Sequence, residues 1–132
     1  MNTALTSGDL ELLRGDNYAW FVTLNADGTP AASVTWIDAT ETHVLVNTAV
    51  GRRKDHNVRR DPRVTVALQR HGDAYRWVSI EGFVEHRETG PEAEAHIDVL
   101  CRRYDGEPWT PVEGQERVRW HVRPTRIVRY GE

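Results

Sequence analysis

Cysteine and lysine are both nearly absent from this sequence: of its 132 residues, only Cys101 is a cysteine and only Lys54 is a lysine. A lone cysteine excludes an intrachain disulfide and a zinc site built from cysteines. No apolar run approaches the roughly 20 residues that span a bilayer, and the first residues lack the basic and apolar regions of a secretory signal. We therefore expect a cytoplasmic protein that does not enter a membrane.

The overall charge is small as well. The net charge is -3 at pH 7 and the pI is near 6.1, so no global field attracts nucleic acid or anionic lipid. Hydrophobic residues make up 39% of the chain and the mean hydropathy is -0.62, so five tryptophans must supply much of the core's apolar surface. A chain of this length is typical of one domain, and we expect a single domain over residues 1–132.

Short apolar runs separated by turns dominate the pattern. Residues 63–69 and 117–123 alternate with period two, as half-buried strands do, and the second run would turn Val118, Trp120 and Val122 inward. The predicted strands cover residues 19–24, 31–37, 43–48, 63–69, 76–87, 117–123 and 125–130.

Glycine and proline mark the breaks between and within these strands. Asp27-Gly28 is typical of a hairpin turn, and residues 38–42 form another predicted turn. Pro124 is expected to separate the last two strands. Gly82, in mid-strand, indicates a bulge or a close approach by another group.

One helix is clearly marked. It begins at Gly90-Pro91, ends at Asp105-Gly106, and places Cys101 on an apolar stripe, which indicates a core position. A shorter helix is predicted at residues 6–14, with Ser7 as its cap. Six to seven antiparallel strands with one or two flanking helices indicate a mainly β (α+β) protein, and small antiparallel sheets commonly close into a barrel.

The densest positive charge lies in residues 52–63, Arg-Arg-Lys-Asp-His-Asn-Val-Arg-Arg-Asp-Pro-Arg. This segment follows a predicted strand and begins a predicted short helix, whose N-terminal N–H groups and dipole favour an anion. Lysine is a compact point charge that suits a phosphate, and the other 16 basic residues are all arginine. We therefore predict that Arg52, Arg53 and Lys54 bind a phosphate-bearing cofactor.

The same segment has two alternative interpretations. It is a solvated helix face if Asp55 and Arg59, four residues apart, form an ordinary surface pair. Arg59, Arg60 and Arg63 are expected to be solvated or paired with Asp61. A nucleic-acid surface is disfavoured, because residues 52–63 contain no aromatic side chain for base stacking.

Catalytic and metal-binding patterns are not evident. Six histidines are scattered along the chain without a helical pair at ligand spacing, so we expect no metal site, and we assign no catalytic residue. Trp36, Trp77 and Trp109 are candidates for lining a planar ligand, with core packing or a dimer interface as the alternative. Trp109, in a proline-rich loop, is the candidate for a lid.

Three segments carry a family resemblance: Thr-Leu-Asn-Ala-Asp-Gly-Thr-Pro at 23–30, the basic segment at 52–63, and Trp-Val-Ser-Ile-Glu-Gly at 77–82. Together they resemble the pyridoxamine-5′-phosphate-oxidase-like split β-barrels, and most closely the branch that uses the deazaflavin coenzyme F420. The resemblance covers residues 8–130 and is most specific over 47–63. It implies an FMN-binding split-barrel type of fold and a homodimer with the cofactor between the protomers.

The resemblance also implies which residues bind the cofactor. Thr48, Arg52, Arg53 and Lys54 would hold its phosphate, and the backbone of residues 32–34 would face its ring. Asn57 would brace the phosphate-binding segment, and Trp77 would come from the other protomer. The implied cofactor-binding residues are Ala32, Ser33, Val34, Asn47, Thr48, Gly51, Arg52, Arg53, Lys54, Asn57 and Trp77.

The implied activity is hydride transfer from reduced F420 to a small unsaturated organic substrate. Solvent, or a hydroxyl group such as that of Ser33 or Thr48, would supply a proton. FMN is the alternative cofactor. The C-terminal substrate-binding arginine segment of the vitamin B6 oxidases is not identified here, so pyridoxamine phosphate is not the expected substrate. A non-enzymatic binder of a flavin or a haem-like ligand is the other alternative.

Overall fold

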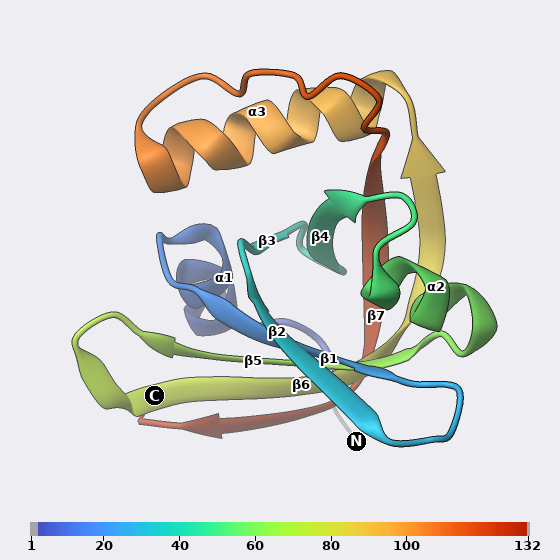
Figure 1. The fold of residues 1–132 in the computed structure, drawn as a ribbon. Coiled ribbons are helices and arrows are strands. Elements are labelled where there is room, and N and C mark those ends of the chain that lie inside the picture. The colour runs from blue at the N-terminus through green and yellow to red at the C-terminus, as the bar shows by residue number, and fades with distance from the viewer. Residues whose placement is uncertain (1–2, 132) are drawn as a thin grey trace.

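A computed structural model describes residues 3–131 and places seven strands in one antiparallel sheet, with three helices around it (Figure 1). The strands are β1 Ala19–Leu24, β2 Pro30–Thr35, β3 Asp38–Ala39, β4 Val44–Ala49, β5 Arg63–Arg70, β6 Asp73–Thr89 and β7 Arg117–Tyr130. The helices are α1 Ser7–Arg14, α2 Arg53–Arg60 and α3 Pro91–Asp105. The sheet order is β2-β1-β5-β6-β7-β4-β3. The predicted mainly β architecture is confirmed.

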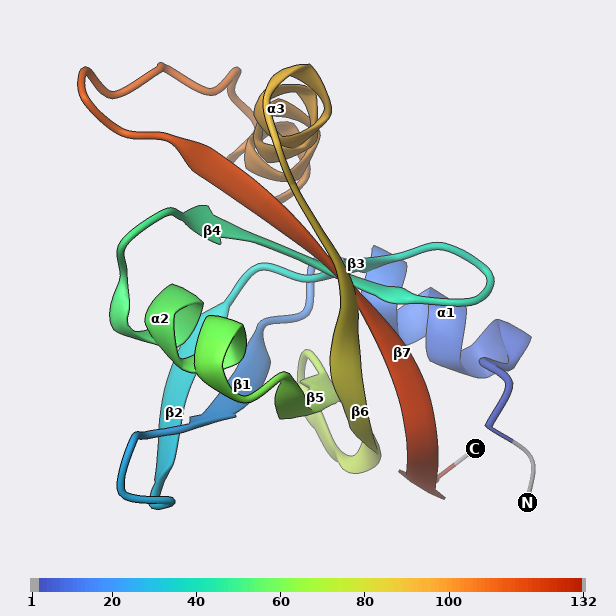
Figure 2. The same cartoon turned by 90° about the vertical axis from the view of Figure 1, so that its right-hand side faces the viewer.

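The two longest strands give the sheet its curl. β6 pairs with β5 along its first part and with β7 along most of its length, while the first part of β7 also pairs with β4. Each long strand therefore belongs to both halves of the sheet, which bends between them into a half-barrel (Figures 1 and 2). This curl brings β2, β4 and α2 to the same side of the molecule.

The bend between β6 and β7 lies at Gly82 and Pro124. The register shifts between Glu81 and Gly82, so that Gly82 is opposite Pro124 and Thr125 is the extra residue of a bulge. A Cβ on Gly82 would lie 2.3 Å from the carbonyl oxygen of Arg123, which confirms the predicted close approach. The expected break at Pro124 is wrong: β7 is continuous, because a bulge tolerates a residue without an N–H group.

The core lies inside the curl. Val118, Trp120 and Val122 are all fully buried, as their alternation predicts. The ring of Phe21 on β1 meets Trp120 edge to face, with centroids 5.5 Å apart, and so joins the two halves of the sheet. The predicted core position of Cys101 on α3 is also confirmed.

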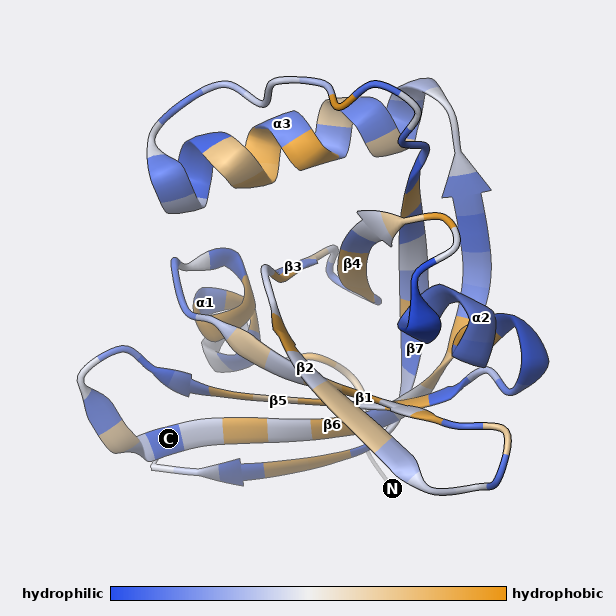
Figure 3. Ribbon diagram, in the orientation of Figure 1, coloured by the Kyte–Doolittle hydropathy of each residue, from blue (hydrophilic) through white to orange (hydrophobic). Residues whose placement is uncertain are grey.

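The helices differ in character. α3 carries apolar residues along one stripe, whereas α2 is hydrophilic over nearly all of its length (Figure 3). α3 begins and ends where it was predicted, with Gly106 in the left-handed conformation at φ +75°. No helix of residues 3–131 is long and apolar enough to cross a membrane.

Two local predictions need correction. Thr6, not Ser7, caps α1, because its hydroxyl and the Asp9 carboxylate form a reciprocal capping box. The predicted turn at residues 38–42 contains the two-residue strand β3, which pairs with β4.

Replacement of Gly82 by alanine tests the close approach at the bend. We expect Gly82→Ala to lower the free energy of unfolding by about 1–3 kcal/mol, because the new methyl group must displace a backbone carbonyl. Urea denaturation measures this change, with Ser79→Ala on the same strand as the control. An unchanged stability would contradict the packing described here.

Candidate functional site

The N-terminal end of α2 is exposed and has no side-chain cap. Gly51 turns the chain out of β4 with φ +92°, and Arg52, the N-cap residue, makes no capping hydrogen bond. Arg52 and Arg53 are exposed and Lys54 is half-buried. Free backbone N–H groups and three cations therefore share one short turn, which is an arrangement that favours an anion.

A buried ion pair holds α2 in this position. Asp55 is 0% exposed, and its carboxylate accepts hydrogen bonds from Arg87 Nε at 2.9 Å, from Arg87 Nη2 at 2.8 Å and from the Gly51 N–H at 3.2 Å. Burial alone would raise the pKa of Asp55, but the bonds and charge of Arg87 and the Gly51 N–H hold this pKa below its ordinary value. Asp55 is therefore not part of a surface pair with Arg59.

The other side of α2 is attached to the β1–β2 hairpin. Asn57 Nδ2 donates to Thr23 Oγ1 at 3.0 Å and to Asn25 Oδ1 at 3.1 Å. Arg60 Nη2 donates to the carbonyl oxygen of Leu24 at 2.6 Å, and Arg60 is exposed, as predicted. The predicted pairing of Arg63 with Asp61 is confirmed, with a distance of 2.8 Å between Nη2 and Oδ2.

Two neighbouring pockets adjoin the start of α2. The first, called here the β2 pocket, has a volume of about 400 Å³. It is lined by Thr23, Ala31, Ala32, Ser33, Val34, Arg52, Arg53 and Lys54. It brings together the two groups of residues predicted to face a cofactor ring and a cofactor phosphate, which come from β2 and α2.

The second pocket, called here the Trp109 pocket, has a volume of about 270 Å³. It is lined by Tyr18, Val34, Thr35, Trp36, Asn47, Arg52, Lys54, Ile97, Trp109 and Arg117. It shares Val34, Arg52 and Lys54 with the β2 pocket, so the two are adjacent. Two of the three tryptophans predicted to line a planar ligand, Trp36 and Trp109, lie here.

Asn47 connects the Trp109 pocket to a buried polar network. Its Oδ1 accepts a hydrogen bond from Arg117 Nε at 3.0 Å, and its Nδ2 donates to the carbonyl oxygen of Ala93 at 2.9 Å. His96, 3.4 Å from Asn47, bonds through Nε2 to Asp38 at 3.0 Å. Burial alone would raise the pKa of Asp38, but hydrogen bonds, led by that of His96, keep this pKa low. Asn47 is thereby fixed as an orienting group.

The charged residues that line the two pockets are all cationic. No acidic residue of the described chain lines either pocket. Burial, together with the charges of Arg52 and Arg117, lowers the pKa of Lys54. Burial and the charge of Arg52 lower the pKa of Arg117 to about 10. Like charges are thus held close together without an ion-pair partner among residues 3–131, and a bound anion would relieve their repulsion.

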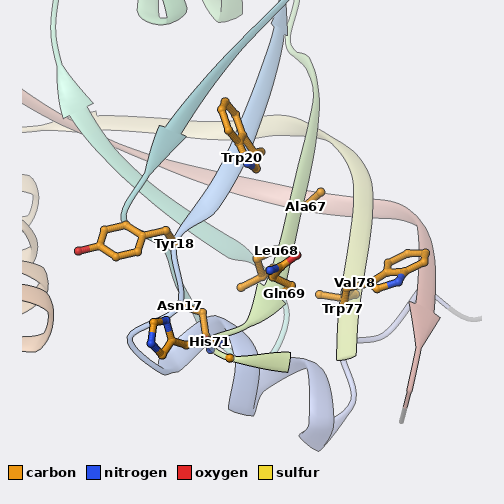
Figure 4. Close-up of a pocket in the computed structure, with 10 residues that line it drawn as sticks. Asn17, Tyr18, Trp20, Ala67, Leu68, Gln69, His71, Trp77 and Val78 are labelled. Atoms are coloured by element: carbon orange, nitrogen blue, oxygen red, sulfur yellow. The ribbon is translucent and has the colours of Figure 1, made fainter. Parts of the chain in front are cut away.

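Four predicted site residues line neither pocket. Gly51 and Asn57 support α2, as described above, whereas Thr48 and Trp77 lie elsewhere. Thr48 is 1% exposed, and its hydroxyl has no hydrogen-bond partner among residues 3–131. Trp77 lines a cavity of about 460 Å³ with Trp20 and Gln69, and no lysine or arginine is among the described residues that line it (Figure 4). The Trp77 ring stacks on Tyr130, with centroids 5.9 Å apart. Within one chain, Trp77 therefore does not join Lys54.

Sequence reasoning missed Arg117. Its strand turns Val118, Trp120 and Val122 inward, so Arg117 has the outward register of Arg119, yet Arg117 is only 5% exposed. The Trp109 ring covers it, with the guanidinium carbon 5.1 Å from the ring centroid. This cover comes from the loop after α3, and strand periodicity carries no signal for it.

One group of potential metal ligands occurs among residues 3–131. Atoms of His86, Glu88 and His121 lie within 4.8 Å of one another on β6 and β7. Arg119 Nε is 2.5 Å from the Glu88 carboxylate, so this carboxylate already has a cationic partner within the chain. The cluster shares no residue with either pocket at α2.

Comparisons with known proteins agree with this architecture. A family model described as pyridoxamine 5′-phosphate oxidase matches residues 9–129. A solved structure named F420 reductase has 28% identity over 89% of this chain and 94% of its own, with a TM-score of 0.81. No curated protein matches this chain in sequence.

Two further solved structures show the likeness of fold alone. The conserved hypothetical protein Rv2991 from Mycobacterium tuberculosis has 23% identity over 98% of this chain and 88% of its own, with a TM-score of 0.73. General Stress Protein 26 from Bacillus anthracis has 17% identity over 90% and 88%, with a TM-score of 0.69.

The buried ion pair under α2 gives a stability prediction. We expect Arg87→Met to lower the free energy of unfolding at pH 7 by about 3 kcal/mol, because it leaves the Asp55 carboxylate buried with only a backbone donor. Arg59→Met, an exposed change on the same helix, should alter it by less than about 0.5 kcal/mol. Urea denaturation measures both.

The same pair gives a pH dependence. The native pKa of Asp55 is depressed, so its stabilising effect is present above the ordinary value of 3.8 and is lost as the pH falls through the native pKa. The stability difference between wild type and Arg87→Met should therefore shrink below about pH 4. A difference that does not shrink at all as the pH is lowered below 3.8 would contradict the role given to Asp55.

Proposed function

The chain belongs to the pyridoxamine 5′-phosphate oxidase family, whose model matches residues 9–129, and we propose that it is an oxidoreductase that uses coenzyme F420 to reduce a small unsaturated organic substrate. The observation that carries this proposal is the convergence of Arg52, Arg53 and Lys54 on the β2 pocket without an acidic partner. A cofactor phosphate supplies the missing negative charge. The similarity to an F420 reductase supports the choice of cofactor.

The cofactor is proposed to lie in the β2 pocket. Arg52, Arg53, Lys54 and the free N–H groups of α2 hold its phosphate, and Gly51 allows the sharp turn that starts the helix. The backbone of residues 32–34 on β2 lies beside its ring. Asn57 keeps α2 at the correct distance from the β1–β2 hairpin.

When bound, reduced F420 would supply a hydride, which together with one proton from solvent would reduce a double bond by two electrons. The residues of this chain anchor and orient the reactants. Attachment at the phosphate contributes binding energy remote from the reacting atoms and holds the ring in place for transfer. The buried ion pair between Asp55 and Arg87 keeps the anchoring residues in position.

The arrangement of the aromatic residues supports a homodimer with the cofactor at its interface. Trp20 is paired with Val34 on β2 and lies on the same face of the sheet as Val128 on β7, and all three are exposed. Trp77 and the exposed Tyr130 continue this apolar surface. Exposed aromatic surface of this kind is typical of protein interfaces, and a partner seated on it can bring its own Trp77 to the cofactor.

FMN is the alternative cofactor, because its phosphate fits the same cations. Titration of the purified protein with each cofactor, followed by cofactor fluorescence, separates the two. We expect micromolar binding of F420 and much weaker binding of FMN. Tight FMN binding without a response to F420 would overturn the preference and would also change the reaction class, since reduced flavin reacts readily with oxygen and reduced deazaflavin does not.

A second candidate function is a non-enzymatic carrier of the cofactor. In the described chain no carboxylate, histidine or cysteine lines the β2 or the Trp109 pocket, so the commonest general acids are missing from both, and Lys54 is assigned to the phosphate. Oxidation of the reduced cofactor in the presence of a panel of enones and quinones tests this. Tight binding with no substrate-dependent oxidation would favour the carrier.

Replacement of Lys54 tests the phosphate site. We expect Lys54→Ala to weaken F420 binding by about 1–3 kcal/mol, the usual value for a charge-assisted contact, and to leave the free energy of unfolding nearly unchanged. Arg59→Ala, which removes one exposed cation from the same helix, is the matched control. Equal losses of affinity in the two variants would mean that general charge, and not the site, attracts the cofactor.

A further inference from the structure

Arg117 is a buried cation that forms no ion pair with an acid of residues 3–131. The residue is only 5% exposed. Its Nε donates to Asn47 Oδ1 at 3.0 Å and its Nη1 donates to Gln115 Oε1 at 3.1 Å, whereas its Nη2 bonds to no residue of the described chain. Glu94 offsets part of the charge from a distance but makes no ion pair with it. A free donor of this kind is available to a ligand in the Trp109 pocket.

The charges around Arg117 strengthen this conclusion. Arg52 and Lys54 line the same pocket, and the positive charge of each repels the guanidinium of Arg117. Burial of a cation beside other cations costs free energy unless an anion offsets it. Glu94 offsets only part of this charge, and no acid among the described residues lines the pocket, so an anion from outside the chain would supply the rest.

The walls of the Trp109 pocket indicate the shape of that anion. The guanidinium of Arg117 lies 5.1 Å from the centroid of the Trp109 ring. Trp36 is fixed by stacking on Tyr104, with centroids 5.4 Å apart and planes only 4° from parallel. Rigid aromatic walls with a cation at one end suit a flat, conjugated anion. The β2 pocket has no aromatic wall, so the two pockets suit different molecules.

We propose that the Trp109 pocket is the substrate site and that it takes a flat, conjugated carboxylate whose anionic end is held by Arg117. This inference rests on the proposed function, since Val34, Arg52 and Lys54 are shared by the two pockets and place the substrate beside the cofactor. Arg117 is a specificity-determining residue in this scheme. Arg117 Nη2, which bonds to no residue of the described chain, and the neighbouring Lys54 provide donors for the two carboxylate oxygens.

Calorimetric titration of the cofactor-free protein with cinnamate, a flat conjugated carboxylate, tests the proposal. Cinnamamide, its neutral counterpart of nearly the same shape, is the matched ligand. We expect cinnamate to bind about tenfold more tightly or better, the ratio that one charge-assisted contact provides. Arg117→Gln should abolish this preference and leave the affinity for cinnamamide unchanged, while Arg117→Lys should retain part of it.

Two controls separate binding from folding. Arg126→Gln removes an exposed cation from the same strand, β7, and should leave the preference for cinnamate intact. Thermal unfolding should show that Arg117→Gln still folds cooperatively, because the removal of a buried charge without an ion pair offsets the loss of its hydrogen bonds to Asn47 and Gln115. Cinnamate should raise the unfolding temperature of the wild type and not that of Arg117→Gln.

Three results would overturn the proposal: no binding of either ligand, equal binding of both, or a preference that survives in Arg117→Gln. The affinity for F420 should be unchanged in Arg117→Gln. If the F420 affinity of Arg117→Gln falls and F420 displaces cinnamate, then Arg117 binds an anionic group of the cofactor. In that case the substrate assignment fails, while the proposed function stands. Failure of F420 to bind, with cinnamate behaving as expected, would overturn the proposed function and support the anion pocket.

Discussion

The buried ion pair between Asp55 and Arg87 is the interaction on which the site depends. It fixes a short, hydrophilic helix, α2, that has little apolar surface with which to pack. Helices of this length are marginal in water and need tertiary contacts. Because Asp55 faces inward and accepts bonds from Arg87 and from the Gly51 N–H, the preceding residues are held at the pocket edge. Asp55 therefore positions the cations although its own carboxylate is buried and does not line either pocket.

The consequence is a separation of charge within one small segment. The carboxylate of Asp55 is bonded to Arg87, and Lys54, Arg52 and Arg117 form no ion pair with an acid in the part of the chain that the structure describes. Two adjacent pockets share two of these cations and differ in their walls, one backbone-rich and one aromatic. A cofactor that carries a phosphate and a flat anionic substrate, side by side, together satisfy both the charge and the shape.

Much of the fold follows from local patterns, and the site follows only in part. Strand periodicity predicted that Trp120 lies in the core, and the glycines at its two ends predicted where α3 begins and ends. Each of these signals depends only on residues that are close together in the sequence. The continuity of β7 through Pro124 was missed, since the bulge that permits it depends on Gly82 of another strand. The burial of Arg117 was missed for the same reason: a ring distant in the sequence covers it.

A crystal structure of the protein with bound F420 tests the central claim most directly. The account predicts the cofactor phosphate within hydrogen-bond distance of Lys54 and the first N–H groups of α2, with the ring against the backbone of residues 32–34 and the Trp109 pocket open beside it. A cofactor that lies elsewhere and leaves the β2 pocket empty would contradict the account.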